Sequence, residues 1–174
     1  MSAQPVQAPG LATILAVDRP ASRRIAESEL TLAQVMLPSD ANPRGNVHGG
    51  TLMKLADTAG GIAASRHARS RVVTAVMDSM TFLEPVYVGD LLLLRAALTW
   101  VGRTSIEVEV TIDAENVQQG SRRHTSTAFL VYVALDEDGR PREVPPLSLE
   151  TLEEQQRWQE AERRRAYRLA QRSP

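Results

Sequence analysis

The stretch from residue 104 to residue 114 restricts the possible folds more than any other, because apolar and polar side chains alternate along it without interruption. The apolar positions are Ile106, Val108, Val110 and Ile112, and the polar positions between them are Glu107, Glu109, Thr111 and Asp113. Side chains at alternate positions of a β-strand lie on opposite faces of the sheet. The pattern therefore predicts a strand with one buried face, whose other face meets solvent or a partner sheet.

Further strand patterns lie on both sides of this segment. The strands that we expect besides it cover residues 30–37, 71–83, 91–101 and 125–135. These stretches are rich in β-branched and apolar residues, and tight turns at residues 102–103 and 116–120 separate the later ones. Because short turns can join only antiparallel neighbours, we expect an antiparallel sheet of four or five strands.

One long helix precedes most of these strands. Residues 38–45 are dense in turn-forming residues, and residues 49–66 then carry apolar side chains at helical spacing. Gly60 and Gly61 weaken this helix, which indicates the close approach of another backbone. A single apolar helix with an antiparallel sheet predicts an α+β fold in which the sheet wraps around the helix.

The length of the chain, 174 residues, is enough for one domain with a single core. We expect a flexible segment over residues 1–25, a folded domain over residues 26–146 and a charged C-terminal helix over residues 147–174. That last helix is rich in Glu, Gln and Arg, and its arginines lie near its end, where cations suit the helix dipole. We expect it either to pack on a neighbouring subunit or to stand free.

The composition excludes several classes of function. The chain has no cysteine, which excludes disulfides, thiolate nucleophiles and cysteine-based zinc sites. It has three histidines, no two of them at metal-ligand spacing, so we expect no metal site. The net charge of −1 favours neither nucleic acid nor a membrane surface as a partner. No stretch approaches the ~20 apolar residues of a membrane span, and we expect a cytoplasmic protein.

The start of the predicted helix carries the most distinctive chemistry. Asp57 lies off the apolar face among small residues, and Asn46 precedes the helix in the loop. Free N–H groups at Gly49 and Gly50 could stabilise a developing oxyanion. Asp57 lies about 10 Å further along the helix axis, so it cannot reach those groups within one chain. A second copy related by a two-fold axis could bring its own carboxylate there, which predicts a dimer with shared sites.

The sequence has no nucleophile elbow, phosphate loop or dinucleotide fingerprint. What it does contain is Gly45-Asn46-Val47-His48-Gly49-Gly50, Asp57, Gly60-Gly61, Val73-Thr74-Ala75 and Phe129-x-x-Tyr132-Val133. Together these motifs resemble the acyl-CoA thioesterases of the hotdog fold, especially the brain-type acyl-CoA hydrolases and their bacterial single-domain relatives. The resemblance covers roughly residues 26–170.

This resemblance implies a helix gripped by an antiparallel sheet, and a homodimer whose two sheets are continuous. It further implies that the dimers assemble in threes, as a hexamer. The implied activity is the hydrolysis of fatty acyl-CoA to a free acid and CoA, with CoA as part of the substrate and no cofactor. In that family an asparagine of the loop and an aspartate of the helix come from opposite protomers, and Asn46 and Asp57 match those positions.

We assign roles on this basis. Asp57 activates water as a general base or attacks the thioester carbonyl itself, and Asn46 positions the water or the thioester. Backbone groups of the loop and helix start stabilise the oxyanion, at His48, Gly49 and Gly50. The phosphates of CoA call for arginines. The candidates are Arg103 with Thr104 and Ser105 in one hairpin, and Arg122 with Arg123 at the start of the last strand.

Two other functions remain open at this point. A non-catalytic acyl-CoA sensor could use the same fold, although such a protein would normally carry an added regulatory domain. A hotdog-fold hydratase would need an Asp and His pair beside the helix entry, whereas this loop offers Asn46 and His48 without an adjacent aspartate.

Overall fold

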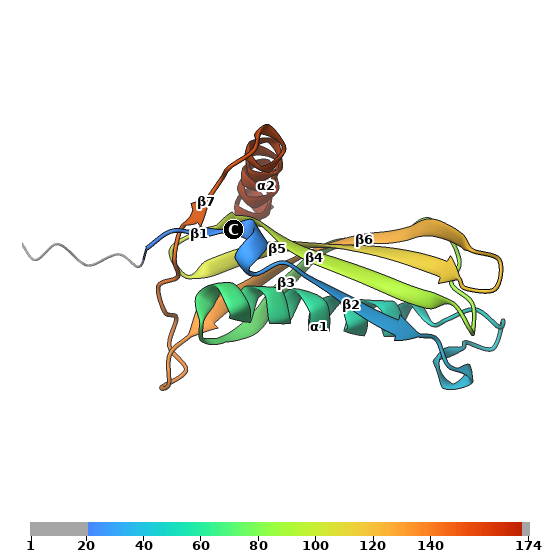
Figure 1. Ribbon diagram of the computed structural model, residues 1–174. Helices are drawn as coiled ribbons and strands as arrows, with labels where there is room; N and C mark the ends of the chain where they lie inside the picture. Colours follow the sequence, from blue (N-terminus) through green and yellow to red (C-terminus); the bar gives the residue numbers. More distant parts are fainter. Residues whose placement is uncertain (1–20, 172–174) are drawn as a thin grey trace, which may run out of the picture.

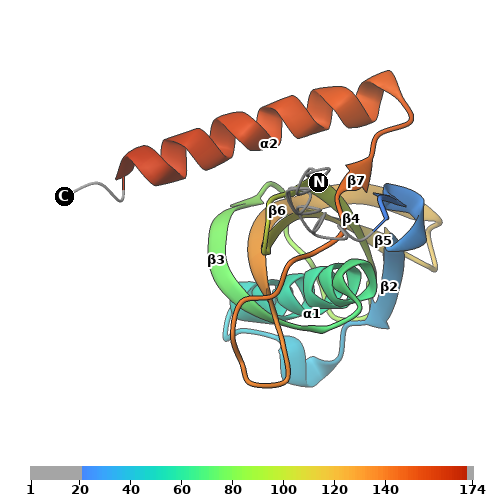
Figure 2. The same cartoon turned by 90° about the vertical axis from the view of Figure 1, so that its left-hand side faces the viewer.

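The structure, a computed structural model, describes residues 21–171. Its centre is a five-stranded antiparallel sheet in the order β2-β4-β5-β6-β3. The strands are β2 (Leu30–Val35), β3 (Arg71–Phe82), β4 (Leu91–Val101), β5 (Ser105–Asn116) and β6 (Ser121–Leu135). The sheet curls around the long helix α1 (Gly49–Ala68), as the views across and along this helix show (Figures 1 and 2). The predicted α+β architecture is therefore confirmed.

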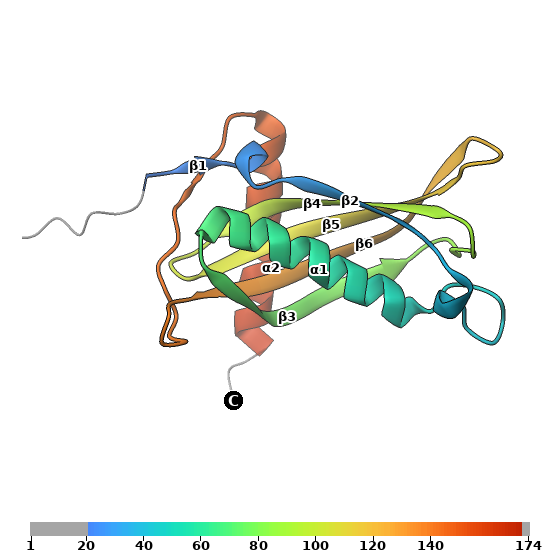
Figure 3. The ribbon, with the colours of Figure 1, turned by 60° about the horizontal axis from the view of Figure 1, so that its bottom comes forward.

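The alternation along β5 buries one face of this strand completely against α1. Ile106, Val108, Val110 and Ile112 all have no exposed surface. The helix meets them with Ala56, Ala59, Ala63 and Ala64, which are also fully buried. Such small side chains let a helix lie close to a sheet, so the core is densely packed. Figure 3 shows α1 lying along the sheet, across β5 and β6.

The ends of the elements differ from the expectations by a few residues. Helix α1 continues two residues past the predicted end, and Arg69 closes it in a left-handed conformation (φ 52°). Strand β6 starts at Ser121 rather than at residue 125. Its first residues are polar and show no apolar alternation, but they pair with residues 113–116 of β5 through the backbone.

A second helix covers the other face of the sheet. Helix α2 (Leu152–Gln171) crosses the strands on the side away from α1 (Figures 1 and 3). It packs on the sheet of its own chain, so it does not stand free, and its packing on a neighbouring subunit stays a prediction. Trp158 of α2 lies 5.9 Å from Trp100 of β4, centroid to centroid, and Arg164 stacks over the ring of Phe129.

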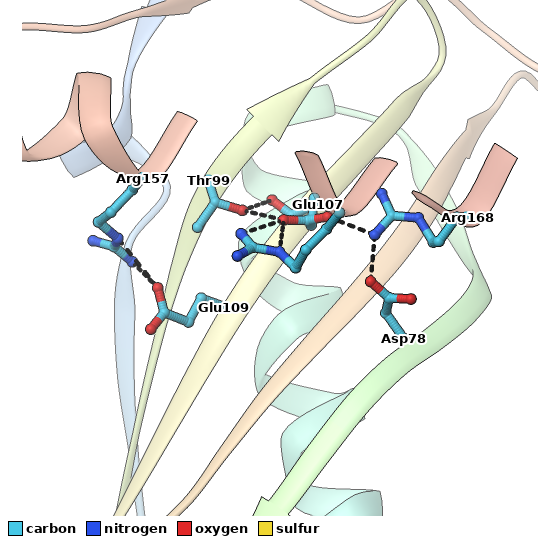
Figure 4. Close-up of polar contacts among 7 residues, drawn as sticks. Asp78, Thr99, Glu107, Glu109, Arg157 and Arg168 are labelled. Atoms are coloured by element: carbon cyan, nitrogen blue, oxygen red, sulfur yellow. Dashed lines mark hydrogen bonds and ion pairs between the residues drawn. The ribbon is translucent and has the colours of Figure 1, made fainter. Parts of the chain in front are cut away.

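Ion pairs join α2 to the polar face of β5 (Figure 4). Arg164 donates to Oε1 of Glu107 at 2.8 Å, and Arg168 donates to Oε2 of the same carboxylate at 2.8 Å. Thr99 also donates to Oε1, at 2.9 Å, and Arg157 of α2 donates to Glu109 at 2.6 Å. Glu107 is fully buried, contrary to the expectation that this face meets solvent or a partner. Burial of a carboxylate requires such pairing.

Short elements complete the described part of the chain. Strand β1 (Arg23–Arg24) pairs in parallel with β7 (Leu147–Ser148), and two 3₁₀ turns cover Ile25–Glu27 and Pro38–Asp40. Residues 1–20 of the segment expected to be flexible lie outside the described residues. No helix within residues 21–171 is long and apolar enough to cross a bilayer.

The outer edge of β3 has no neighbour within the described chain. This strand pairs only with β6, and register shifts interrupt the pairing near Thr74 and Met77. Val73 and Phe82 on β3 are about half exposed, at 47% and 51%. An open strand edge with apolar side chains is suited to pairing with another chain.

Candidate functional site

Asp57 lies half-buried on the side of α1 that faces β3 and β6. The hydroxyl of Thr74 donates to its Oδ1 at 2.6 Å. The hydroxyl of Tyr132 donates to the Asp57 carbonyl oxygen at 3.0 Å and lies 3.3 Å from the same Oδ1. Within residues 21–171, nothing donates to Oδ2. One carboxylate oxygen is thus held in place, while the other is available for chemistry.

The hydroxyl group of Tyr132 keeps its proton and can therefore always donate a hydrogen bond in this arrangement. Its side chain is buried, and burial raises the pKa of its hydroxyl far above the ordinary value; the nearby Asp57 carboxylate raises it further. The phenol therefore stays protonated at every pH at which the protein is expected to work.

Gly60 makes room for this tyrosine. A Cβ atom at Gly60 would lie 2.4 Å from the Tyr132 hydroxyl oxygen, which is far closer than two such atoms can come. The close approach expected at the glycine pair is real, but the neighbour is a side chain rather than another backbone.

A groove opens beside Asp57 and runs along α1. Its volume is about 550 Å³. The helix lines it with Asp57, Thr58, Gly61, Ile62, Ser65, Arg66 and Arg69, and the strands line it with Val72, Thr74 and Tyr132. The groove therefore has a carboxylate at one end and two arginines at the other.

The loop before α1 is folded by its own hydrogen bonds. The backbone N–H of Asn42 donates to the carbonyl of Asn46 at 2.7 Å, and the side chain of Asn42 accepts from the backbone of Arg44 at 2.8 Å. Asn46 also forms a backbone bridge with Tyr87. Neither asparagine forms a hydrogen bond with Asp57 of the same chain within the described residues, in agreement with the helical rise.

His48 caps the start of α1. Its Nδ1 accepts a hydrogen bond from the backbone N–H of Gly50 at 3.1 Å. The amide of Gly50 is thus already engaged, whereas the amide of Gly49 has no partner within residues 21–171. Of the helix-start groups predicted to hold an oxyanion, Gly49 is the one that keeps an unused N–H donor.

The arginines predicted to bind CoA lie at opposite ends of the sheet. Arg103 and Thr104 belong to the turn between β4 and β5, and Ser105 starts β5; Arg103 lies 3.7 Å from Glu143. Arg122 and Arg123 follow the turn between β5 and β6. Both ends of the strands are visible in Figure 1. One chain cannot bring the two groups to a single CoA molecule.

The two arginines of β6 are also engaged by acids. Arg122 forms a salt bridge with Asp113 at 2.6 Å. Arg123 donates to Asp90 at 2.6 Å and to the carbonyl of Pro85 at 3.0 Å. Both guanidinium groups therefore already have a carboxylate partner in the place that a CoA phosphate would take.

Residues 21–171 contain no group of three His, Asp or Glu side chains placed to hold a metal ion. The histidines are far apart in the chain and have other partners. His67, at the end of α1, is buried with its Nε2 2.7 Å from the Pro145 carbonyl oxygen. His124 lies 3.0 Å from Asp113.

Comparison with known proteins places this site in a family. A profile described as the thioesterase superfamily matches residues 44–121. The acyl-CoA thioester hydrolase YkhA of Bacillus subtilis, itself uncharacterised, is 39% identical over 138 residues, which cover 79% of this chain and 80% of YkhA. The chain belongs to the acyl-CoA thioester hydrolases of the thioesterase superfamily.

Solved structures of this family share the fold at similar identity. An apo-hexameric acyl-CoA thioesterase matches with a TM-score of 0.84 and 36% identity, over 87% of this chain and 97% of that one. An acyl-CoA hydrolase from Staphylococcus aureus, in complex with butyryl-CoA and CoA, matches with a TM-score of 0.81 and 34% identity, over 87% and 92%. The human cytosolic acyl-CoA thioester hydrolase is 35% identical, but the chain spans only 39% of its length.

Two residues that contact Asp57 had no predicted role. Thr74 and Tyr132 belong to motifs that the sequence displays, yet only the structure shows both hydroxyls on the Asp57 carboxylate. Each is a hydroxyl in an otherwise apolar strand segment, and a buried hydroxyl generally has a hydrogen-bond partner. That is the signal by which they could have been found.

Proposed function

We propose that this protein hydrolyses acyl-CoA thioesters to free acid and CoA, with Asp57 as its central catalytic residue. The observation that carries the proposal is a carboxylate held through one oxygen by Thr74 and Tyr132, beside an open groove. Relatives named as acyl-CoA thioester hydrolases support the same reaction. The reaction needs only water and the thioester, so no cofactor is part of the proposal.

The free Oδ2 of Asp57 is the reacting oxygen in this scheme. As a general base, it takes a proton from water while the water oxygen attacks the thioester carbonyl carbon. The carbon–sulfur bond then breaks and CoA leaves as a thiolate, which takes up the proton. As a nucleophile, Oδ2 itself attacks the carbonyl, CoA leaves, and water then cleaves the resulting anhydride. The unused N–H of Gly49 is the proposed oxyanion donor, and it would act on the site of a partner protomer.

The asparagine of the site is better placed at Asn42 than at Asn46. The Staphylococcus aureus hydrolase has also been solved as alanine mutants of an asparagine, an aspartate and a threonine, the asparagine fifteen residues before the aspartate and the threonine seventeen after it. The same spacings separate Asn42, Asp57 and Thr74 in this chain. The backbone of Arg44 holds the Oδ1 of Asn42, which leaves its amide N–H groups as donors.

A partner protomer is needed to bring this asparagine to Asp57. The open edge of β3, next to Thr74, is where a second chain would continue the sheet. A two-fold axis at that edge would give two sites, each with an aspartate from one protomer and an asparagine from the other. Hexameric relatives support a trimer of such dimers. A cytoplasmic location follows by analogy with the cytosolic mammalian relatives.

Release of free thiol from a series of acyl-CoA substrates tests the proposal. Asp57→Asn should lower kcat by about 100- to 10,000-fold while the protein stays folded and oligomeric. Asn42→Ala should lower kcat by about 100-fold, as expected for the loss of one polarising donor. Asn46→Ala tests the alternative assignment: little effect supports Asn42, and a comparable loss supports Asn46. Wild-type protein that binds acyl-CoA without releasing thiol would instead be a sensor.

Sharing of the site between protomers has its own test. Co-expression of Asp57→Asn and Asn42→Ala chains gives mixed dimers, each with one intact site and one doubly defective site. Random pairing should restore about a quarter of wild-type activity, although each variant alone is nearly inactive. Absence of any recovery would show that both residues act within one chain.

A further inference from the structure

We propose that the C-terminal end of α2, residues 164–171, is a contact between protomers, which lies at the two-fold axis of the dimer side by side with the same end of a second copy of the chain. The inference rests on the proposed function, because the shared site determines how the two β3 strands pair. It concerns the outer face of the sheet, away from α1 and from the groove beside Asp57.

Helix α2 extends past the edge of the sheet of its own chain. Figures 2 and 3 show the helix crossing the strands toward β3 and ending beyond this strand. Trp158 packs on Trp100 of β4, and ten residues later Arg168 donates to Asp78 of β3 at 2.5 Å. The residues after Arg168 therefore lie at the open edge, where the described chain has no further strand beneath them.

The shared site determines how two β3 strands would pair. Thr74 contacts Asp57 of its own chain. Phe82, at the other end of β3, lies beside the start of α1, since a Cβ atom at Gly49 would be 3.6 Å from its ring. The proposed site joins Asp57 of one protomer to the helix start of the other, so Thr74 should lie opposite the partner's Phe82. Antiparallel strands in that register have their two-fold axis midway, at about Asp78.

Asp78 is also the residue of β3 that binds the end of α2. Arg168 joins its carboxylate to the buried Oε2 of Glu107, at 2.8 Å (Figure 4). The axis that the shared site requires therefore passes close to the end of α2. A two-fold axis perpendicular to the continuous sheet keeps both α2 helices on the same face. It brings their ends together, and each end then continues over the β3 strand of the partner.

The end of α2 carries large side chains that its own chain does not cover. Tyr167 is 66% exposed and Leu169 is 48% exposed. At about 100° per residue they lie on opposite flanks of Arg168. Leu169 borders a hollow of about 190 Å³ over Ala75 and Val76, on the side of β3 that precedes Asp78. Tyr167, on the other flank, therefore faces the axis and a helix that lies alongside.

The charges at this end are compatible with such a contact. Arg164 and Arg168 are already paired with Glu107 and Asp78, so the arginines of the two helices do not meet as free cations. The negative ends of both helix dipoles also lie there. A tyrosine with an apolar ring and a polar hydroxyl is typical of the centre of a protein interface.

Distances between spin labels test this arrangement directly. The chain has no cysteine, so Ala170→Cys and Leu152→Cys each provide a single labelling site. Both positions are exposed, and they lie at opposite ends of α2. Labels at residue 170 should lie within about 20 Å of each other, because helices packed side by side have axes about 8–10 Å apart. Labels at the control residue 152 should be about 45–50 Å apart, since this residue lies about 24 Å along the helix from Arg168.

A substitution in the contact gives a second measurement. Tyr167→Glu should raise the dissociation constant of the dimer by about tenfold or more, as expected for an aromatic residue at the centre of an interface. Leu152→Glu, at the exposed start of the same helix, is the matched control and should stay within about twofold of wild type. Sedimentation over a dilution series measures the dissociation, and circular dichroism should show unchanged helical content in both variants.

Two outcomes would overturn the inference. One is a distance above about 35 Å between labels at residue 170 in a protein that is dimeric or larger, and the other is a protein that is monomeric at all concentrations. Thiol release, assayed separately, decides the proposed function. A short distance without turnover retains the contact and refutes the proposed function, whereas a long distance with normal turnover does the reverse.

Discussion

Asp57 and Glu107 lie on opposite faces of the same sheet, and their surroundings differ in a way that separates function from structure. Asp57 receives two neutral hydroxyl groups on one oxygen and keeps the other oxygen toward a groove. Glu107 has no exposed surface, and the guanidinium groups of Arg164 and Arg168 occupy both of its oxygens. The carboxylate proposed to react keeps one oxygen without a donor, whereas the carboxylate that joins α2 to the sheet has partners on both oxygens.

The two faces of the sheet also differ in the kind of contact that joins each of them to its helix. The α1 face is closed by alanines and β-branched residues, and burial of apolar surface stabilises it. The α2 face is joined by ion pairs and by stacking of arginine on aromatic rings. We therefore expect substitutions on the α2 face to change the free energy of unfolding, and substitutions around Asp57 to change turnover.

The largest effect should follow substitution of Glu107 by alanine. This change leaves Arg164 and Arg168 partly buried without their shared partner, which typically costs about 3–5 kcal/mol. Urea unfolding should show that loss, while kcat per folded molecule stays near the wild-type value. Glu115→Ala, near the end of the same strand and without an ion pair in the described residues, is the control. A large loss of kcat with an unchanged free energy of unfolding would show that Glu107 serves turnover rather than stability.

A smaller loss of stability, now together with a loss of turnover, should follow Gly60→Ala. The added methyl group would overlap the Tyr132 hydroxyl, so that the ring must move away from Asp57. We expect kcat to fall by about tenfold and the free energy of unfolding by about 1–3 kcal/mol, the usual cost of overpacking. Both are measurable on the same preparation.

Tyr132→Phe sharpens this prediction. It removes the hydroxyl without adding volume, so we expect a loss of kcat similar to that of Gly60→Ala with a smaller loss of stability. Because the hydroxyl is absent, adding Gly60→Ala to this variant should cost less than it costs in wild type. Full additivity of the two changes would show that the glycine does not act through the tyrosine.

The smallest expected effect is a change of stability with pH caused by His67. This residue, at the end of α1, contacts Pro145 in the segment that leads to α2. Burial lowers the pKa of His67 below its ordinary value of 6.5, despite the hydrogen bond to Pro145. The unfolded chain binds this proton more readily than the folded one, so stability should fall as the pH drops below about 6.5. Thermal unfolding between pH 7.5 and pH 5 measures the change, and His67→Gln should make the curve flatter. A wild-type curve no steeper than that of the variant would contradict a neutral, buried histidine.

Much of the α1 face could be predicted from the sequence, because local signals agree there. The spacing of apolar residues in 49–66 and the alternation in 104–114 each correspond to one periodic element with one buried face. The position of Asp57 off the apolar stripe of the helix follows from the same periodicity. The role of Asn46 stays a prediction, with Asn42 now the preferred asparagine.

The α2 face could not be predicted in this way. A helix rich in Glu, Gln and Arg has the same pattern whether its polar side meets water or a second polar surface. The acids of β5 and the arginines of α2 are 48 to 61 residues apart in the chain, so no local pattern connects them. The expectation that Glu107 is accessible was therefore reasonable from periodicity and wrong in the structure.

The sequence by itself determined the order of the elements, the antiparallel sheet around one helix and the carboxylate at position 57, since periodicity and turn residues act over short distances along the chain. Only the tertiary structure decided that Thr74 and Tyr132 bind one oxygen of Asp57, that Gly60 admits the tyrosine ring, and that α2 buries Glu107. These contacts join residues far apart in the chain, and their geometry exists only once the sheet has closed around the helix.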